Sequence, residues 1–295
     1  MVKILDGTAT SKEIRSEVAQ GVVEMQQRHG VTPGLAAIMV GDDPASAIYV
    51  RNKGRACQDV GIFSQTFHLP GSTSQEELLK LIGSLNSDPR FHGILVQLPL
   101  PQHMDEGRVL MAVSPEKDVD ALHPVNTGKL AQGNADYLPA TPGGVQQLLL
   151  RNGYDPGGKH VVICGRSNIV GKPLAMLLMQ KRSGANATVT VCHTGTRDLG
   201  ELTRQADILV AAMGRPRIIT ADIVKEGAIV VDVGLNQVPD PTRKTGYRLV
   251  GDVDFEAVSE KAEAITPVPG GVGPMTIALL LVNTLTAARI SIHGR

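Results

Sequence analysis

The sequence has few aromatic residues and no tryptophan. Aromatic side chains make up 3% of the 295 residues. Proteins that bind single-stranded nucleic acid stack the bases on aromatic rings, so this scarcity argues against that function. The charges also balance, with 29 Lys and Arg against 29 Asp and Glu. Because binding to nucleic-acid phosphates usually needs a surplus of basic residues, we expect no nucleic-acid partner.

Cysteine is also scarce, and long apolar runs are missing. The three cysteines, Cys57, Cys164 and Cys192, lie far apart and form no Cys-x-x-Cys pair. This spacing excludes a disulfide framework and the usual zinc sites, so we expect a reducing compartment and no metal. The smooth apolar run 277–282 has six residues, whereas a membrane helix needs about 20. With no apolar leader near Met1, the sequence predicts a soluble, cytoplasmic protein without a membrane partner.

Hydrophobic residues make up 42% of the chain, and its length is enough for about two domains. In the first 120 residues, apolar runs alternate with segments of helical spacing. This alternation is typical of a parallel sheet covered by helices. We predict strands at 35–40, 62–69 and 93–98 and helices at 10–29, 46–60 and 74–85.

The alternation restarts after a segment that contains Pro, Gly and Asn, residues 114–144. The order of elements that follows is typical of a doubly wound, Rossmann-like unit. The fold class is therefore α/β with two domains, and the last helix is compatible with covering either of them. We predict strands at 160–164, 187–192, 208–213, 228–233 and 264–266, and helices at 142–152, 169–181, 199–206 and 276–289.

A glycine-containing loop, residues 165–173, follows a predicted strand and opens a predicted helix. A dinucleotide-binding loop must lie in this context. Ser167 stands at the second glycine position of the usual Gly-x-Gly-x-x-Gly motif, and Gly171 comes one residue late. Gly165 permits a tight turn, and the helix N-terminus attracts a pyrophosphate. An ordinary strand–helix turn is the alternative interpretation.

The next predicted strand, 187–192, bears on the choice of nucleotide. NAD sites usually place an acidic residue at its end, where it binds the ribose hydroxyls. Here His193 and Thr194 follow the strand, with no acid. The missing acid, together with Arg166 and Arg197, favours NADP over NAD. Arginines that are merely solvated are the alternative.

Tyr49 and Lys53 are four residues apart on a predicted helix, so they share one face. A lysine shielded from water by a ring has a lowered pKa and can exchange protons near neutral pH. Gln97 lies at the end of a predicted strand, where a buried amide needs a partner such as a ligand or Lys53. The alternatives are a solvated lysine and a glutamine bonded to the backbone.

Two aspartates, Asp118 and Asp120, flank one apolar residue. A carboxylate can accept two N–H groups from an amidine-like edge, such as the edge of a pterin ring. The alternative, which the spacing alone favours, is a charged surface turn. Asp252 and Asp254 have the same spacing and the same alternative.

The segment 267–276 joins a short apolar strand to the last helix. Prolines such as Pro267 fix the chain, while Gly270 and Gly271 allow a close approach of the backbone. This composition suits a loop pressed against a flat cofactor. A structural turn without a ligand is the alternative.

Together these motifs closely resemble those of one family, in the family's order and over nearly the full chain. It is the family of bifunctional methylenetetrahydrofolate dehydrogenases/methenyltetrahydrofolate cyclohydrolases, the FolD family. The resemblance implies oxidation of 5,10-methylene-tetrahydrofolate with NADP and hydrolysis of the methenyl product to 10-formyl-tetrahydrofolate. These reactions belong to one-carbon metabolism and serve purine biosynthesis. The motifs that carry the resemblance are 49–53, 96–101, 115–120, 165–173 and 267–276.

The resemblance also implies a role for each candidate residue. Lys53 would be the main acid/base catalyst, with Gln97 orienting it. Tyr49 would stack on the folate substrate, and Asp120 would anchor the pterin ring. The substrate would also touch Pro267, Gly270 and Gly271, and the cofactor would be bound by Gly165, Arg166, Ser167, Gly171, His193 and Thr194.

The family's fold implies a division of the chain. An N-terminal catalytic and folate domain, residues 1–140, would face a Rossmann-like NADP domain, residues 141–274, across a cleft. The C-terminal helix, 275–295, would pack back on the first domain. Family members are typically homodimers, so we expect a homodimer.

Three features depart from the family's pattern. Ala121 stands where the family usually has glycine, and its methyl group could shift the loop. Ala140 stands where cysteine is common, so a thiol is not needed there. The segment 193–196 replaces a more familiar serine and basic residue. Because Gly195 has no side chain to hold a 2′-phosphate, Arg166 would do more of that work.

Two other interpretations stay open. A shikimate- or amino-acid-dehydrogenase-like enzyme would share the Rossmann half and a catalytic lysine, but it does not explain the motifs 97–101 and 267–276 together. A nucleotide-sensing module without catalysis is disfavoured because Lys53, Gln97 and Asp120 are all present.

Overall fold

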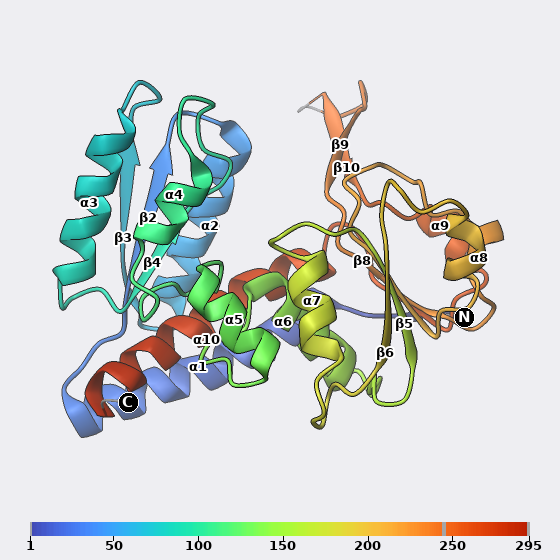
Figure 1. The fold of residues 1–295 in the computed structure, drawn as a ribbon, viewed down its shortest axis with the longest axis horizontal. Helices are drawn as coiled ribbons and strands as arrows, with labels where there is room; N and C mark the ends of the chain where they lie inside the picture. The colour runs from blue at the N-terminus through green and yellow to red at the C-terminus, as the bar shows by residue number, and fades with distance from the viewer. Residues whose placement is uncertain (1, 244–245, 294–295) are drawn as a thin grey trace. The chain divides into compact units, whose positions relative to one another are not determined.

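The computed structural model describes residues 2–243 and 246–293 (Figure 1). The chain forms two compact α/β units, and each is discontinuous in sequence. We name them by their main sheets. The six-stranded unit comprises Met1–Ser11 and Thr141–Thr276, and the three-stranded unit comprises Lys12–Ala140 and Ile277–Arg295.

The three-stranded unit contains a parallel sheet in the order β3-β2-β4. β2 is buried along its whole length, as expected for an apolar run in the middle of a parallel sheet. Strands and helices alternate as predicted, and α4 and α5 are additions that the sequence did not predict. The elements are α1 (Gly7–His29), β2 (Gly34–Val40), α2 (Pro44–Asp59), β3 (Phe63–Leu69), α3 (Gln75–Ser87), β4 (Gly93–Val96), α4 (Glu106–Ala112), α5 (Pro124–Gln132) and α10 (Val272–His293), of which α1 and α10 begin in the other unit.

Capping side chains fix where two of these helices begin. α2 begins after Asp43, whose carboxylate accepts a hydrogen bond from the Ser46 N–H at 2.7 Å, and Pro44 occupies its first position. α3 begins with a capping box, in which Ser74 and Glu77 each accept a hydrogen bond from the other's backbone N–H. The start of α2 matters most, because it sets which residues of that helix face inward.

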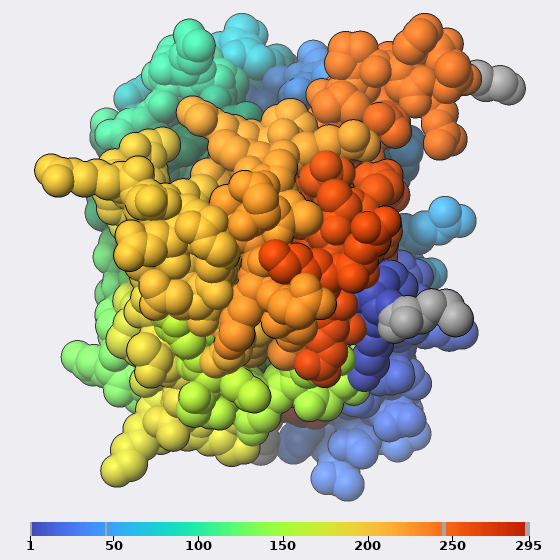
Figure 2. Space-filling model, turned by 90° about the vertical axis from the view of Figure 1, so that its right-hand side faces the viewer, coloured from blue at the N-terminus to red at the C-terminus, as the bar shows by residue number. Residues whose placement is uncertain are grey.

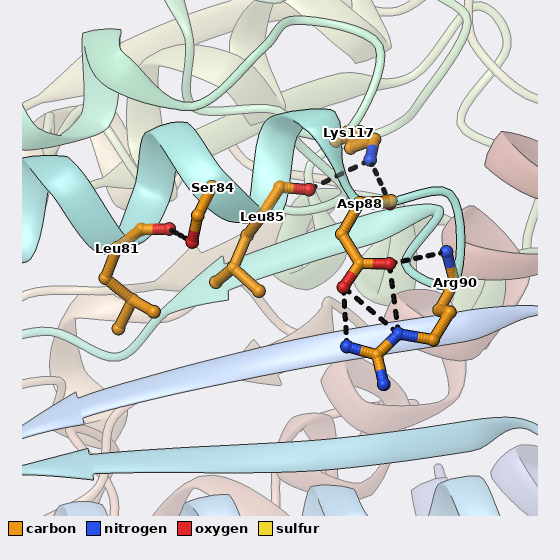
Figure 3. Close-up of polar contacts among 6 residues, drawn as sticks. All are labelled: Leu81, Ser84, Leu85, Asp88, Arg90 and Lys117. Carbon is orange, nitrogen blue, oxygen red and sulfur yellow. Dashed lines mark hydrogen bonds and ion pairs between the residues drawn. The ribbon is translucent and has the colours of Figure 1, made fainter.

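The end of α3 is joined to the segment 117–121. Figure 3 shows the Lys117 ammonium group donating to the carbonyl oxygens of Leu85, at 3.0 Å, and Asp88, at 2.8 Å. A cation is favourable at these carbonyls because they lie at a helix C-terminus. The Asp88 carboxylate binds the Arg90 guanidinium, and these hydrogen bonds lower the pKa of Asp88 to about 2. Lys117 thereby holds the start of the segment 117–121 against α3.

The six-stranded unit contains a parallel sheet in the order β1-β11-β8-β7-β5-β6, which confirms the doubly wound prediction. Lys3 pairs with Ala264, so the first residues of the chain belong to this unit, whereas we expected the N-terminal domain to begin at residue 1. The elements are β1 (Lys3–Ile4), α6 (Ala140–Arg151), β5 (His160–Cys164), α7 (Gly171–Leu178), β6 (Thr188–Cys192), α8 (Leu199–Thr203), β7 (Ile208–Ala211), a 3-10 turn (Ala221–Ile223), β8 (Ile229–Asp232), β9 (Asn236–Pro239), β10 (Tyr247–Val250), α9 (Phe255–Ser259) and β11 (Ala264–Ile265).

Several details of this unit differ from the prediction: α8 ends at Thr203, before the predicted residue 206, and neither α9 nor the 3-10 turn was predicted. α7 ends at Leu178, before the predicted residue 181, because the chain turns back there through a hydrogen bond from Ala187 N to Leu178 O at 2.9 Å. β9 and β10 form an antiparallel hairpin that the sequence did not predict, since its residues are mostly polar or half-exposed. Figure 2 shows the hairpin, in orange, standing out from the surface of this unit.

One described helix is long and apolar enough to cross a membrane, by length and composition alone. It is Val272–Ile292, with a mean hydropathy of 1.6 over its best window. The apolar run 277–282 is much shorter than this helix. The polar residues elsewhere in the helix are few, so its average hydropathy stays high. Leu280 and Leu281 are fully buried, and the buried Asn283 side chain binds neighbouring backbone. In these contacts the helix packs inside the core of its unit.

Candidate active site

Tyr49, Lys53 and Cys57 follow one another at four-residue intervals along α2. Their common face is turned inward, because Lys53 is only 7% exposed and Cys57 is fully buried. Lys53 Nζ lies 5.9 Å from the centre of the half-buried Tyr49 ring. The alternative of a solvated lysine is therefore wrong.

Gln97 follows β4 directly and meets this lysine. The Lys53 ammonium group donates a hydrogen bond to Gln97 Oε1 at 3.1 Å. Gln97 Nε2 donates to the carbonyl oxygen of Leu98 at 2.7 Å, which orients the amide so that its oxygen faces the lysine. The predicted contact with Lys53 is confirmed, and the glutamine side chain is bonded to backbone as well.

Lys53 and Asp120 are coupled electrostatically. Burial lowers the pKa of Lys53 below its ordinary value, and the charge of Asp120 opposes this shift. Burial raises the pKa of Asp120, while Lys53 opposes that shift and Asp118 adds to it. Each group therefore favours the charged form of the other. Burial also raises the pKa of the Tyr49 phenol, which stays protonated at neutral pH.

The backbone around Asp120 is fixed by buried polar side chains. Asp118 Oδ2 accepts two hydrogen bonds at 2.8 Å, one from a backbone N–H and one from the side chain of Asn126. Asn283 of α10 donates to the carbonyl oxygen of Val119 at 2.7 Å. Asp118 thus has a structural role, and the surface-turn interpretation is wrong for it. Within the described residues no hydrogen bond to the Asp120 carboxylate is found, and its electrostatic neighbours are Lys53 and Asp118.

Ala121, the residue where the family usually has glycine, adopts the left-handed conformation, with φ at 56°. L-residues with a Cβ rarely adopt this conformation, whereas glycine adopts it freely. Its methyl group is 2% exposed, so the surrounding core contains it. The loop therefore takes a glycine-like backbone without a glycine.

The loop between β5 and α7 brings backbone very close to backbone. A Cβ on Gly165, whose φ is 136°, would lie 2.1 Å from the carbonyl oxygen of Ala212. A Cβ on Gly171 would lie 2.0 Å from the carbonyl oxygen of Gly165. No side chain caps the first turn of α7, and Ser167 Oγ accepts a hydrogen bond from Val170 N at 3.1 Å. This tight loop with an uncapped helix N-terminus fits a pyrophosphate.

The segment after β6 forms a closed turn. His193 N donates to Thr196 Oγ1 at 2.9 Å, and Gly195 N donates to His193 Nδ1 at 3.0 Å. A Cβ on Gly195 would lie 3.1 Å from the His193 ring, so a larger residue here would require the ring to shift slightly. Thr194 is exposed at the end of the turn, and so is Arg166 on the loop after the neighbouring strand β5.

A buried carboxylate holds the next loop, which follows β7. Asp252 is 0% exposed and accepts hydrogen bonds from the N–H groups of Met213, Gly214 and Arg215 at 2.5, 2.9 and 2.9 Å. It also accepts one from Asn236 Nδ2 at 2.9 Å. The surface-turn interpretation is therefore wrong for Asp252, which fixes a loop at the carboxyl edge of the sheet.

The segment 267–271 packs against the start of α1 within the six-stranded unit. Thr8 N donates to the carbonyl oxygen of Gly270 at 3.1 Å, and a Cβ on Gly7 would lie 1.7 Å from the carbonyl oxygen of Gly271. Gly270 has a φ of 107°, which favours glycine.

Across the described residues, no group of three or more His, Cys, Asp or Glu side chains is arranged to hold a metal ion.

Two models of protein families match the chain. Residues 5–120 match the catalytic domain of tetrahydrofolate dehydrogenase/cyclohydrolase, and residues 139–292 match its NAD(P)-binding domain. The chain belongs to the tetrahydrofolate dehydrogenase/cyclohydrolase family. Tyr49, Lys53 and Asp120 lie in the catalytic-domain match, and the loop at Gly165 lies in the NAD(P)-binding match.

Several relatives cover almost the whole chain. The bifunctional protein FolD of Syntrophus aciditrophicus is 57% identical over 288 residues, which is 98% of each chain. The solved structure of the bifunctional enzyme FolD from Campylobacter jejuni is 48% identical, covers 99% of this chain and 100% of its own, and has a TM-score of 0.92. The Trypanosoma brucei FolD, solved with NADP and an inhibitor, is 41% identical, covers 99% of both chains and has a TM-score of 0.94.

Membership in this family shows what the chain does. It is a bifunctional enzyme of one-carbon metabolism that oxidises 5,10-methylene-tetrahydrofolate and hydrolyses the resulting 5,10-methenyl compound to 10-formyl-tetrahydrofolate. The interpretations as a shikimate-like dehydrogenase and as a nucleotide-sensing module without catalysis are wrong.

Sequence analysis missed several residues that build the site. Asn126 and Asn283 carry no motif, and their partners are known only from the fold. Cys57 had a usable signal, because it follows Lys53 at helical spacing. It lies beside Lys53 in the interior, and burial raises the pKa of its thiol to about 12, so it stays neutral there.

Replacing Asp120 with asparagine should move the pH dependence of turnover toward lower pH. The Asp120 charge raises the pKa of Lys53, so its removal leaves burial unopposed and lowers that pKa further. The rising limb of kcat against pH, where Lys53 loses its proton, should therefore begin at a lower pH. Asp59→Asn, at the exposed end of α2, is the matched control. A limb that stays in place or moves to higher pH would contradict the coupling.

Replacing Ala121 with glycine should change little. Relief of left-handed strain, about 1–2 kcal/mol, is offset by loss of a buried methyl group, about 0.8 kcal/mol, and by the added freedom of the unfolded chain, about 0.5–1 kcal/mol. The melting temperature and the KM for methylene-tetrahydrofolate should therefore stay close to those of the wild type. Ala121→Val, with a branched Cβ, should lower the melting temperature and raise KM. A valine variant that behaves like the wild type would contradict the left-handed backbone.

Proposed function

We propose that the Lys53 side chain is the acid/base catalyst of this enzyme and that Gln97 orients it. The observation that carries this proposal is the hydrogen bond between them, made by a lysine that is 7% exposed and has a lowered pKa. A lysine poised in this way exchanges a proton more readily near neutral pH than a solvated one. Tyr49 stacks on the folate, and Asp120 anchors the pterin ring through two charge-assisted hydrogen bonds.

In the hydrolytic step, the neutral Lys53 amine takes a proton from a water molecule as that water attacks the methenyl carbon. Gln97 Oε1 accepts a hydrogen bond from the lysine and keeps Nζ in one place during this transfer. The ammonium group then returns the proton to the folate nitrogen that leaves as the C–N bond breaks, and the remaining hydroxyl proton of the adduct passes to solvent as the formyl C=O bond forms. Asp120 stabilises the ammonium form between the two events, since its charge raises the pKa of Lys53.

The residues of the β5–α7 loop bind the dinucleotide. We infer that Gly165, Ser167 and Gly171 hold its pyrophosphate and that His193 and Thr194 border its ribose, while the bound NADP supplies the hydride acceptor of the dehydrogenase step. The exposed Arg166 pairs with the 2′-phosphate, which favours NADP over NAD. The Trypanosoma brucei relative was solved with NADP, which supports this choice.

The binding of folate and of NADP is divided between two domains, as in the family's fold. We propose that the three-stranded unit, with most of the C-terminal helix, forms the folate-binding domain and that the six-stranded unit, which includes the first residues of the chain, forms the NADP domain. Pro267, Gly270 and Gly271 contact the substrate from the second of these. The protein is a cytoplasmic homodimer. The resemblance of the motifs to the family supports each of these statements.

Replacing Lys53 with methionine should abolish cyclohydrolase activity, with a loss of about 10²–10⁴-fold in kcat. Absorbance records of reduced nicotinamide and of the acid-stabilised methenyl product measure both activities in one sample. The wild type should form reduced cofactor with little methenyl compound. Lys80→Met, at an exposed position of α3, is the matched control. Full hydrolysis by the Lys53 variant would overturn the assignment, and stoichiometric methenyl accumulation by the wild type would overturn the hydrolytic role of the whole site.

Replacing Arg166 with alanine should raise the KM for NADP by about 10-fold and leave the KM for NAD nearly unchanged. The missing guanidinium removes a charge-assisted contact to the 2′-phosphate, which NAD does not carry. Initial rates with each cofactor at a fixed folate concentration measure the two constants. Equal changes in both would mean that the 2′-phosphate is recognised elsewhere.

A further inference from the structure

Two buried aspartates, Asp232 and Asp252, lie next to each other at the carboxyl edge of the six-stranded sheet. Asp232 is the last residue of β8, and Asp252 comes two residues after β10. They are 3% and 0% exposed, and Asp252 N donates a hydrogen bond to Asp232 Oδ1 at 2.9 Å. Among the residues that the structure describes, every donor found on either carboxylate is a neutral N–H group.

Two glycines make room for these carboxylates. A Cβ on Gly251 would lie 1.8 Å from Asp232 Oδ2, and a Cβ on Gly234 would lie 2.3 Å from Asp252 Oδ1. Both distances are far shorter than a van der Waals contact, so a side chain at either position would displace a carboxylate. The four residues Asp232, Gly234, Gly251 and Asp252 therefore interlock, and we call them the Asp–Gly cluster.

The interior of the protein is an unfavourable place for two negative charges. Burial raises the pKa of Asp232 to about 6, and the charge of Asp252 adds to this shift. The N–H groups of Gly234, Asp252 and Val253 oppose it. Buried ionisable groups with shifted pKa values gather at functional sites, which directs attention to the part of the chain that this cluster holds.

That part is the loop after β7. The Asp252 carboxylate accepts hydrogen bonds from three consecutive N–H groups of the loop, those of residues 213–215, at 2.5, 2.9 and 2.9 Å. Asn236 Nδ2 donates to the same carboxylate at 2.9 Å. An asparagine at position 252 would have one acceptor oxygen with two lone pairs. At least two of the four donors would then lose their partner.

The loop after β7 in turn supports the β5–α7 loop. The two strands pair with Cys164 opposite Ala211, and Ala212 N donates to the carbonyl oxygen of Cys164 at 2.8 Å. A Cβ on Gly165 would lie 2.1 Å from the carbonyl oxygen of Ala212. Because the backbones touch here, a shift of the loop that begins at Ala212 displaces the surface against which Gly165 packs.

We propose that Asp252, supported by Asp232, is a positioning residue for the dinucleotide. It holds the loop after β7 so that the β5–α7 loop keeps the backbone shape that binds a pyrophosphate. This assignment rests on the proposed role of the β5–α7 loop in NADP binding. The residues proposed for hydrolysis, Lys53, Gln97 and Asp120, belong to the other unit. Asp252 therefore serves the dehydrogenase step, which consumes NADP, and not the hydrolytic step, which needs no dinucleotide.

The test measures dinucleotide binding and hydrolysis separately. Asp252→Asn should raise the dissociation constants of NADP and of NAD by the same factor, about 10-fold, because both carry the pyrophosphate. Calorimetric titration without folate measures the two constants. The same variant should hydrolyse methenyl-tetrahydrofolate, supplied without dinucleotide, with the kcat and KM of the wild type.

Asp232→Asn is the milder variant. An asparagine at this position leaves one of three donors unpaired, so both dissociation constants should rise by a smaller factor, about 3-fold. If Asp252→Asn does not fold, this variant decides by the same criteria. Asp254→Asn is the matched control, because Asp254 is half-exposed and its side chain does not cap α9. Its dissociation constants should equal those of the wild type.

Three outcomes would overturn the proposal. The first is unchanged dinucleotide binding in both cluster variants. The second is a rise for NADP alone, which would place the effect at the 2′-phosphate. The third is a loss of hydrolysis equal to the loss of binding, which would show general damage to the fold. A wild type that binds neither NADP nor NAD would instead count against the proposed function of the β5–α7 loop.

Discussion

A lysine that is kept from water next to a carboxylate is the constraint on which the rest of this molecule depends. Burial lowers the pKa of Lys53, and the charge of Asp120 raises it, so the two effects oppose each other. Gln97 adds a neutral acceptor that restricts the direction of the amine without adding charge. These three groups come from three segments of the chain, and the surrounding fold brings them together.

Each unit has a buried aspartate that fixes a loop by accepting hydrogen bonds, from one backbone N–H and the Asn126 side chain at Asp118 and from three backbone N–H groups at Asp252. Asp118 does so beside Asp120, and Asp252 does so beside Gly214. An ionised carboxylate has several acceptor positions, so one side chain can organise several donors in a loop that lacks regular structure. Such a carboxylate cannot be replaced by an apolar residue without leaving those N–H groups unpaired. The loops that surround the chemistry are thus ordered without becoming helix or strand.

Much of the fold could be predicted from local patterns, and much of the site could not. The strands of the six-stranded sheet are short apolar runs, so their positions follow from composition, and the lysine face of α2 follows from helical spacing. By contrast, a pair of aspartates one residue apart looks the same in a surface turn and in a buried one. The three backbone donors to Asp252 lie 37–39 residues away in the sequence, and Asn283 lies 164 residues from Val119. Partners at such distances leave no trace in local spacing.

The contact between Asn283 and Val119 also bears on the order in which the chain folds during synthesis. Residues 12–140 leave the ribosome long before α10 is made, yet α10 supplies the amide that holds the carbonyl next to Asp120. Until then, the nascent three-stranded unit lacks part of its core and one tether of the segment 117–121. This segment is therefore completed only when the ribosome has nearly finished, so a prematurely terminated chain would carry Lys53 without this tether.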